Sequence, residues 1–188
     1  MLNILHFISG DAHESVKRYV FEISEFFMRC GINMILLYIP GQDKNADAEF
    51  VSACQFIDMM TIPLNSKQKP VFPVALTLRA LCEQLEIDVV HTHGSAAFLI
   101  ACFMEFIGSG AVHIHTVHSV SNRRGESNFT NKLLSLCCDE RIVLDELTKQ
   151  AFMKQNVEKL RTAKNHTEFD FEAMIAGVYN VYVRGLRV

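Results

Sequence analysis

The chain has 188 residues, of which 49% are hydrophobic and 21% are charged, and its formal net charge is −3 at pH 7. This composition predicts one well-packed globular domain and excludes an intrinsically disordered chain. Because the basic residues are scattered and the net charge is negative, no nucleic-acid partner is expected.

Cysteine usage and the apolar runs indicate the compartment. The six cysteines are Cys30, Cys54, Cys82, Cys102, Cys137 and Cys138. They include no CxxC pair, and adjacent cysteines do not easily bridge each other, so a reduced, cytoplasmic setting is expected. The opening "MLNILHFISGDAHES" has no basic region, so no signal peptide is expected. The longest apolar run, residues 96–107, is shorter than the roughly 20 residues that span a bilayer, which leaves at most peripheral contact with the inner face of a membrane.

The first part of the chain alternates strand-like and helix-like patterns. "LNILHFI" (2–8) predicts a buried strand, and apolar residues at spacings of three and four predict an amphipathic helix over 16–30. "INMILLYI" (32–39) predicts a second strand. The polar stretch "GQDKNADAEF" (41–50) is expected to be a loop, leading to a third strand near "QFIDMMTI" (55–62).

The rest of the domain continues this alternation. Its expected elements are a helix over 70–85, a strand over 88–92, a helix over 95–107, a strand over 112–117, a loop over 119–128, a helix over 129–137, a strand over 141–144 and a helix over 146–155. Alternating strands and helices predict an α/β fold, with a single Rossmann-like, doubly wound and mostly parallel sheet of six strands within residues 1–156.

The tail has a different pattern. "NVEKLRTAKNHTE" is charged and has no strand-like run, so residues 157–167 are interpreted as a linker. Residues 168–188 then predict one extra amphipathic helix. Its apolar residues are Phe171, Met174, Ile175, Val178, Tyr182 and Leu186. With no seventh strand between, this helix is expected to pack back on the sheet.

Five histidines fall on or just after the fourth and fifth strands. They are His91, His93, His113, His115 and His118. Residues two apart on a strand share a face, so His91 and His93 are expected to point the same way, as are His113 and His115. The three mid-strand histidines, His91, His113 and His115, are interpreted as neutral, hydrogen-bonded core residues.

His93 and His118 differ because each closes its strand at the carboxyl end, where open α/β sheets bind ligands. His93 is followed by Gly94 and Ser95 at a helix start, where free N–H groups receive anions. His118 is followed by Ser119 and a polar loop. If the two strands are neighbours, the two histidines flank one crevice, which makes them candidate functional residues.

Other catalytic patterns have less support. "VVHTHG" looks superficially like the HxH of amidohydrolase and PHP-type metal hydrolases, but those are barrels of about 250 residues, and no further ligand motif appears, so no metal is expected. No GxSxG elbow is present, and the first turn, "SGDAHES", lacks GxGxxG. That turn places Gly10, Asp11 and His13 at the end of the first strand as candidate ligand contacts, although a plain turn explains Gly10 equally well.

Four segments together resemble a known family. "ILHFISGDAHESVKRYVFEISEFFMRCGINMILL", "EIDVVHTHGSAAFLIA", "VHIHTVHS" and "CDERIVLDELTKQAF" resemble, in this order, the N-terminal, acceptor-side half of family-4 retaining glycosyltransferases of the GT-B fold. "FDFEAMIAGVYNVYVRGLRV" resembles the helix with which these enzymes cross back onto that half. Family members carry a donor-binding Rossmann domain with an E-x7-E motif in between, whereas this sequence passes from Gln155 to Asn165 in a few charged residues. The donor domain is therefore expected to be absent.

The resemblance implies roles for particular residues. His118 would contact the donor sugar as the catalytic candidate, and His93, Gly94 and Ser95 would line the acceptor side with Ser119. Arg123 and Arg124 would hold an anionic acceptor, with a solvated pair of loop charges as the equal alternative.

Two departures stand out. Asp11 and Ala12 replace the usual glycine pair of the first turn, and Asp145 replaces the serine that usually ends the sixth strand. A carboxylate repels phosphate, so both positions depart from an ordinary acceptor site.

Three functions remain open. The favoured one is a subunit of a split glycosyltransferase for surface polysaccharide or glycolipid synthesis, inactive alone, acting on a glycan or glycolipid. Its nucleotide-sugar site would come from a separate chain or from a second copy, and it would hold no cofactor of its own. The alternatives are a non-catalytic binding module or decayed remnant, and an independent metal-dependent hydrolase that uses the histidine crevice.

Overall fold

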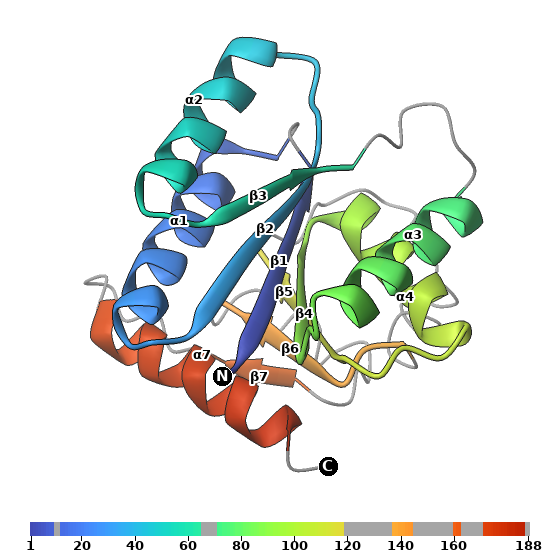
Figure 1. Cartoon of the computed structure of the whole chain (residues 1–188). Helices are drawn as coiled ribbons and strands as arrows, with labels where there is room; N and C mark the ends of the chain where they lie inside the picture. The colour runs from blue at the N-terminus through green and yellow to red at the C-terminus, as the bar shows by residue number, and fades with distance from the viewer. Residues whose placement is uncertain (10–11, 65–70, 119–136, 145–159, 163–170, 187–188) are drawn as a thin grey trace, which may run out of the picture.

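The computed structural model describes residues 1–9, 12–64, 71–118, 137–144, 160–162 and 171–186. Their strands form one parallel sheet in the order β3-β2-β1-β4-β5-β6-β7 (Figure 1). The strands are β1 (Asn3–Ser9), β2 (Asn33–Ile39), β3 (Met60–Pro63), β4 (Val89–His93), β5 (Val112–Val117), β6 (Glu140–Val143) and β7 (Leu160–Thr162). The helices are α1 (Glu14–Arg29), α2 (Lys44–Phe56), α3 (Val71–Gln84), α4 (Ser95–Phe106) and α7 (Phe171–Gly185). The predicted Rossmann-like, doubly wound α/β fold is confirmed.

Helices cover both faces of the sheet (Figure 1). Alternation along β1 turns Ile4, His6 and Ile8 toward α1 and α7, and Leu5 and Phe7 toward α3 and α4. The strand order reverses between β1 and β4, which lie side by side at the centre with His6 in register with His91. In folds of this class, ligands bind at the carboxyl ends of the strands beside such a reversal.

The extra C-terminal helix packs on the sheet, as predicted. Val178 and Tyr182 of α7 are fully buried and join the apolar core under α1. The end of the helix lies so close to β5 that a Cβ added to Gly185 would be 2.7 Å from Val112 Cγ1. Apolar burial and close approach therefore both hold α7 in place. None of the described helices is long and apolar enough to cross a membrane.

The expectation of a loop over residues 41–50 was wrong, because α2 begins at Lys44. The Asp43 carboxylate caps the helix by accepting hydrogen bonds from the N–H groups of Asn45 and Ala46. Asp47 forms a buried ion pair with Lys17 of α1, 3.6 Å between the charged atoms. A cap and a polar contact thus define this helix, whose apolar periodicity is weak. Its C-terminal end also shifts the third strand to Met60–Pro63.

The expectation that residues 157–167 contain no strand was also wrong. β7 pairs in parallel with β6 and forms the edge of the sheet, in register from Arg141 opposite Leu160 to Val143 opposite Thr162. A strand of three residues lacks the length to show an alternating pattern. The described sheet therefore has seven strands where six were predicted.

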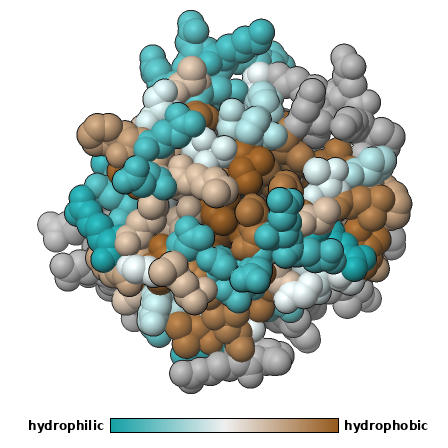
Figure 2. Space-filling model, viewed as in Figure 1, coloured by the Kyte–Doolittle hydropathy of each residue, from teal (hydrophilic) through white to brown (hydrophobic). Residues whose placement is uncertain are grey.

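Apolar side chains also remain on the outside of the molecule. Figure 2 shows them gathered among polar ones in the middle of the view and at its right, toward α3 and α4. The exposed apolar residues of these two helices are Phe72, Leu76, Leu99, Phe103 and Phe106. The outer side of α3 and α4 therefore keeps apolar surface in contact with solvent.

Candidate functional site

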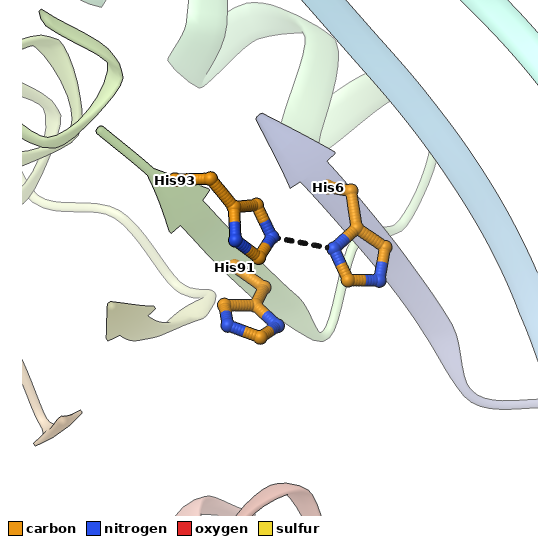
Figure 3. Close-up of side chains that lie close together, drawn as sticks. All are labelled: His6, His91 and His93. Carbon is orange, nitrogen blue, oxygen red and sulfur yellow. Dashed lines mark hydrogen bonds between the residues drawn. The ribbon is translucent and has the colours of Figure 1, made fainter. Parts of the chain in front are cut away.

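A chain of three imidazoles crosses the centre of the sheet on the face covered by α1 and α7. His6 Nδ1 lies 2.8 Å from His93 Nε2, and His93 Nδ1 lies 3.1 Å from His118 Nε2. Figure 3 shows the first of these hydrogen bonds, which joins β1 to β4. The side chains thus connect the buried middle of β1 to the carboxyl end of β5. We call His6, His93 and His118 the imidazole chain.

The solvent exposure of the side chains decreases along the imidazole chain from His118 to His6. His118 is half-buried, whereas His93 and His6 are fully buried. The ring of Tyr19, on α1, packs edge-on against both His93 and His118, with centroid distances of 5.8 and 5.0 Å. The two histidines at the strand ends therefore lie together, as their positions on neighbouring strands indicated, but only His118 reaches the surface.

His91 is held separately. Its Nδ1 lies 2.7 Å from the hydroxyl of Tyr182 on α7, and its Nε2 lies 2.6 Å from Thr116 Oγ1 on β5. Both ring nitrogens are thus hydrogen-bonded, and the side chain is fully buried. The expectation of a buried, hydrogen-bonded core residue is confirmed for His91.

The remaining strand histidines face α4 on the other side of the sheet. His113 Nε2 and His115 Nδ1 share the hydroxyl of Thr92, at 3.1 and 2.9 Å. His113 also donates through Nδ1 to the carbonyl of Cys137, and Phe98 stacks on His115 with a centroid distance of 4.2 Å. Both histidines are buried, so their interpretation as core residues is confirmed.

Burial keeps the imidazole chain neutral. It lowers the pKa of His6 to about 3 and that of His118 to about 4. Burial, and then the neighbouring His91 and His6, lower the pKa of His93 well below its ordinary value. Near neutral pH, each ring therefore carries one proton and offers one N–H and one bare nitrogen.

The first turn of α4 lies directly after His93. Its N-cap is Gly94, with φ +85° and ψ 160°, a conformation that L side chains rarely adopt. No side chain caps this helix, and its first backbone bond runs from the N–H of Phe98 to the carbonyl of Gly94. The N–H groups of residues 95–97 thus lack intrahelical partners and are oriented to receive an anion.

Three of the described histidines have the geometry to approach a metal ion. The ligand atoms of His6, His91 and His93 all lie within 4.8 Å of one another (Figure 3). The rings are neutral, as metal binding requires, but each donates or accepts hydrogen bonds already described. Both nitrogens of His93 and both nitrogens of His91 are hydrogen-bonded, so a metal would have to displace one bond of each ring.

The other predicted site residues are distributed as follows. His13 is exposed at the start of α1, where its Nδ1 accepts from the N–H of Ser15 and contacts Ser15 Oγ at 2.8 Å, so its observed contacts are those of a helix cap. Ser95 is the first residue of α4, beside His93. The predicted residues outside the described part of the chain are Gly10, Asp11, Ser119, Arg123, Arg124 and Asp145.

Sequence reasoning missed His6 and Tyr19. A single histidine in an apolar strand gives no sign of a partner. However, the strand order of this fold class places the first and fourth strands side by side, which brings His6 beside the "HTH" motif. Period-two alternation along the two strands would then have placed His6 and the histidines of this motif on one face of the sheet.

Comparison with known proteins agrees with the fold. The profile of Glycosyltransferase Family 4 matches residues 16–165, so the chain belongs to this family. No curated protein gives a significant match.

Solved structures are similar over nearly the whole chain. A glycosyltransferase from Rickettsia africae is 17% identical, with a TM-score of 0.72, over 96% of this chain and 50% of that one. Anabaena HepE, solved in complex with UDP, is 12% identical, with a TM-score of 0.63, over 86% of this chain and 43% of that one. A sucrose-phosphate synthase structure from Thermosynechococcus elongatus is 15% identical, with a TM-score of 0.62, over 96% of this chain and 98% of that one. The chain thus spans about half the length of the first two proteins.

Proposed function

We propose that this chain is the acceptor-side half of a glycosyltransferase, and that a separate chain supplies the nucleotide-sugar site. Family membership and the likeness to about half of the Rickettsia and Anabaena proteins support this proposal. α7 then corresponds to the family's crossing helix, which here covers the acceptor-side domain with no donor domain between. The acceptor is a glycan or glycolipid of a surface polysaccharide pathway, reached at the inner face of a membrane.

One observation carries the proposal. His118 and His93 are hydrogen-bonded to each other at 3.1 Å, at the carboxyl ends of β4 and β5, next to the uncapped first turn of α4. A neutral imidazole at this edge offers hydrogen bonds to sugar hydroxyls. The N–H groups of α4 suit a phosphate of the acceptor, with Arg123 and Arg124 as its further contacts.

The same chemistry predicts that the chain is inactive alone. Departure of a nucleoside diphosphate requires positive charge or several donors aimed at the leaving group. The histidines at this edge are neutral because burial lowers the pKa of His118 to about 4, and burial, then the neighbouring His91 and His6, lower the pKa of His93 well below its ordinary value. The charge that stabilises the leaving group therefore comes from the donor-binding partner.

Co-purification tests the proposal directly. A tagged chain, expressed at its normal level in its native source, is expected to bring down a nucleotide-sugar-binding Rossmann protein, identified by mass spectrometry. Sugar transfer to a lipid or glycan extract should require both proteins. With the partner present, His118→Gln should reduce transfer at least tenfold, while Glu49→Gln, on the exposed side of α2, should not.

Two outcomes contradict the proposal. Turnover of a nucleotide-sugar by the purified chain alone would make it an independent enzyme. Absence of both transfer with any co-purified protein and binding of sugars or phosphates would indicate a remnant that retains only the fold.

A further inference from the structure

The buried end of the imidazole chain has an unpaired nitrogen. Among the described residues, His6 Nε2 is buried and has no hydrogen-bond partner. The His6 side chain is fully buried beneath α1 and α7, so solvent does not reach this atom. The other end of the imidazole chain, at His118, is half-buried and reaches the carboxyl edge of the sheet.

The two bonds between rings couple the proton positions of all three. Each bond needs one N–H and one bare nitrogen, and a neutral imidazole has one of each. Two neutral arrangements satisfy both bonds. In the first, every ring carries its proton on Nδ1, so that His6 donates to His93 and His93 donates to His118. In the second, every proton is on Nε2 and the bonds run in the opposite direction.

The environment of His6 distinguishes the two arrangements. The second places an N–H of His6 in the buried interior with no acceptor, whereas the first leaves only a bare nitrogen there. Buried N–H groups without an acceptor are rarer in proteins than buried acceptors without a donor. At the His118 end, solvent can satisfy either form. The surroundings of His6 therefore determine which arrangement forms, and the hydrogen bonds of His93 extend that arrangement to His118.

We propose that His6 and His93 are positioning residues that fix His118 as the Nδ1–H tautomer, so that His118 presents a hydrogen-bond donor at the carboxyl edge of β5. This inference deepens the proposed function and rests on it for the ligand: the donor suits an oxygen of a sugar, either a hydroxyl or the ring oxygen. A solvated, neutral histidine side chain favours the opposite tautomer, with its proton on Nε2. The protein thus overrides the intrinsic preference of the ring.

Nitrogen-15 NMR of the histidine-labelled full chain at neutral pH reads the tautomer without any ligand. Protonated and bare nitrogens of a neutral imidazole resonate far apart, and His118→Gln assigns the relevant pair by its loss. We expect Nδ1 of His118 to be protonated and Nε2 to be bare. A protonated Nε2, or two protonated nitrogens, overturns the proposal.

Two isosteric variants test the part played by His6. His6→Asn keeps a donor facing His93, so His118 should remain the Nδ1–H tautomer. His6→Asp offers an acceptor, which should reverse both bonds and move the proton of His118 to Nε2. His113→Asn, which replaces a buried histidine on the opposite face, is the control and should change nothing at His118. If all three variants leave His118 alike, His6 does not position it.

The spectrum and the transfer assay fail independently. An Nδ1–H tautomer in a chain that never takes part in sugar transfer supports the positioning inference and contradicts the proposed function. An Nε2–H tautomer in a chain that transfers sugar with its partner does the opposite.

Discussion

The hydroxyl of Tyr182 lies 2.7 Å from Nδ1 of His91, and this bond joins the last described helix to the central strand of the sheet. The other nitrogen of His91 is hydrogen-bonded to Thr116 Oγ1 on β5, so one imidazole links three elements. His91 lies two residues before His93 on the same face of β4, with ring centroids 4.3 Å apart. The packing of α7 on the sheet is thus linked, through His91, to His93 of the candidate site.

Removing this hydroxyl tests the link. Tyr182→Phe keeps the buried ring but leaves Nδ1 of His91 without its partner, so the free energy of unfolding should fall by about 1–3 kcal/mol. Tyr179→Phe, at an exposed position one turn earlier on α7, is the matched control and should change it by less than about 0.5 kcal/mol. Urea unfolding measures both, and equal effects would show that the bond contributes nothing.

Loss of α7 should expose the apolar face that it covers. A chain lacking residues 168–188 is expected to be insoluble, because the apolar core residues that Val178 and Tyr182 cover become exposed to solvent. Val178→Asp tests the same contact in the full chain, where an unpaired buried charge should cost about 4 kcal/mol or prevent folding. Asn180→Asp, on the exposed side, should fold normally. A soluble, cooperatively unfolding truncation would contradict this prediction.

The turn after His93 depends on glycine for conformation alone. Gly94 has φ +85°, and a Cβ added there meets no atom within 4 Å, so the cost of Gly94→Ala is backbone strain of about 1–3 kcal/mol. Gly110→Ala has equal space and no such φ, so it should be close to neutral. Thermal unfolding of the two variants gives the comparison. A neutral Gly94→Ala would mean that the turn readily adopts another conformation.

The buried histidines should make the fold acid-sensitive. The pKa of His6 falls from 6.5 to about 3 on folding, so below pH 6.5 the unfolded chain binds a proton that the folded chain does not. The stabilisation is complete above pH 6.5 and is lost as the pH falls toward 3. Between pH 6.5 and 5 this amounts to roughly 2 kcal/mol for such a histidine. His6→Asn should therefore show a shallower loss of stability than the unmodified chain, whereas parallel curves would contradict the assignment.

The strands that consist of long apolar runs were predicted correctly from the sequence. β5 has the predicted bounds, and β1, β2 and β4 differ from prediction by a residue or two, because runs such as "NMILLYI" carry a clear strand signal. α2 and β7 were missed because neither is stabilised mainly by a periodic apolar face. α2 buries only Asp47 and Cys54 and depends on a cap, while β7 is stabilised by pairing with β6 at the sheet edge. Neither contribution appears in the hydrophobic pattern.

The candidate site was predictable only where sequence position alone determines geometry. His93 and His118 could be placed together because both end neighbouring strands. The bond from His6 to His93 crosses 87 residues of sequence, and the bond from Tyr182 to His91 crosses 91. Such pairs arise from strand order and helix docking, which no local pattern specifies.

The long separation between His91 and Tyr182 also has a consequence at the ribosome. β4 precedes α7 by many residues in the chain, so the nascent chain displays an apolar sheet face that stays uncovered until α7 has been synthesised. Contacts that join distant parts of a chain form late and leave it open to misassembly in the meantime. We expect the nascent chain to need a chaperone during this interval, and to become independent of it once α7 has packed on the sheet.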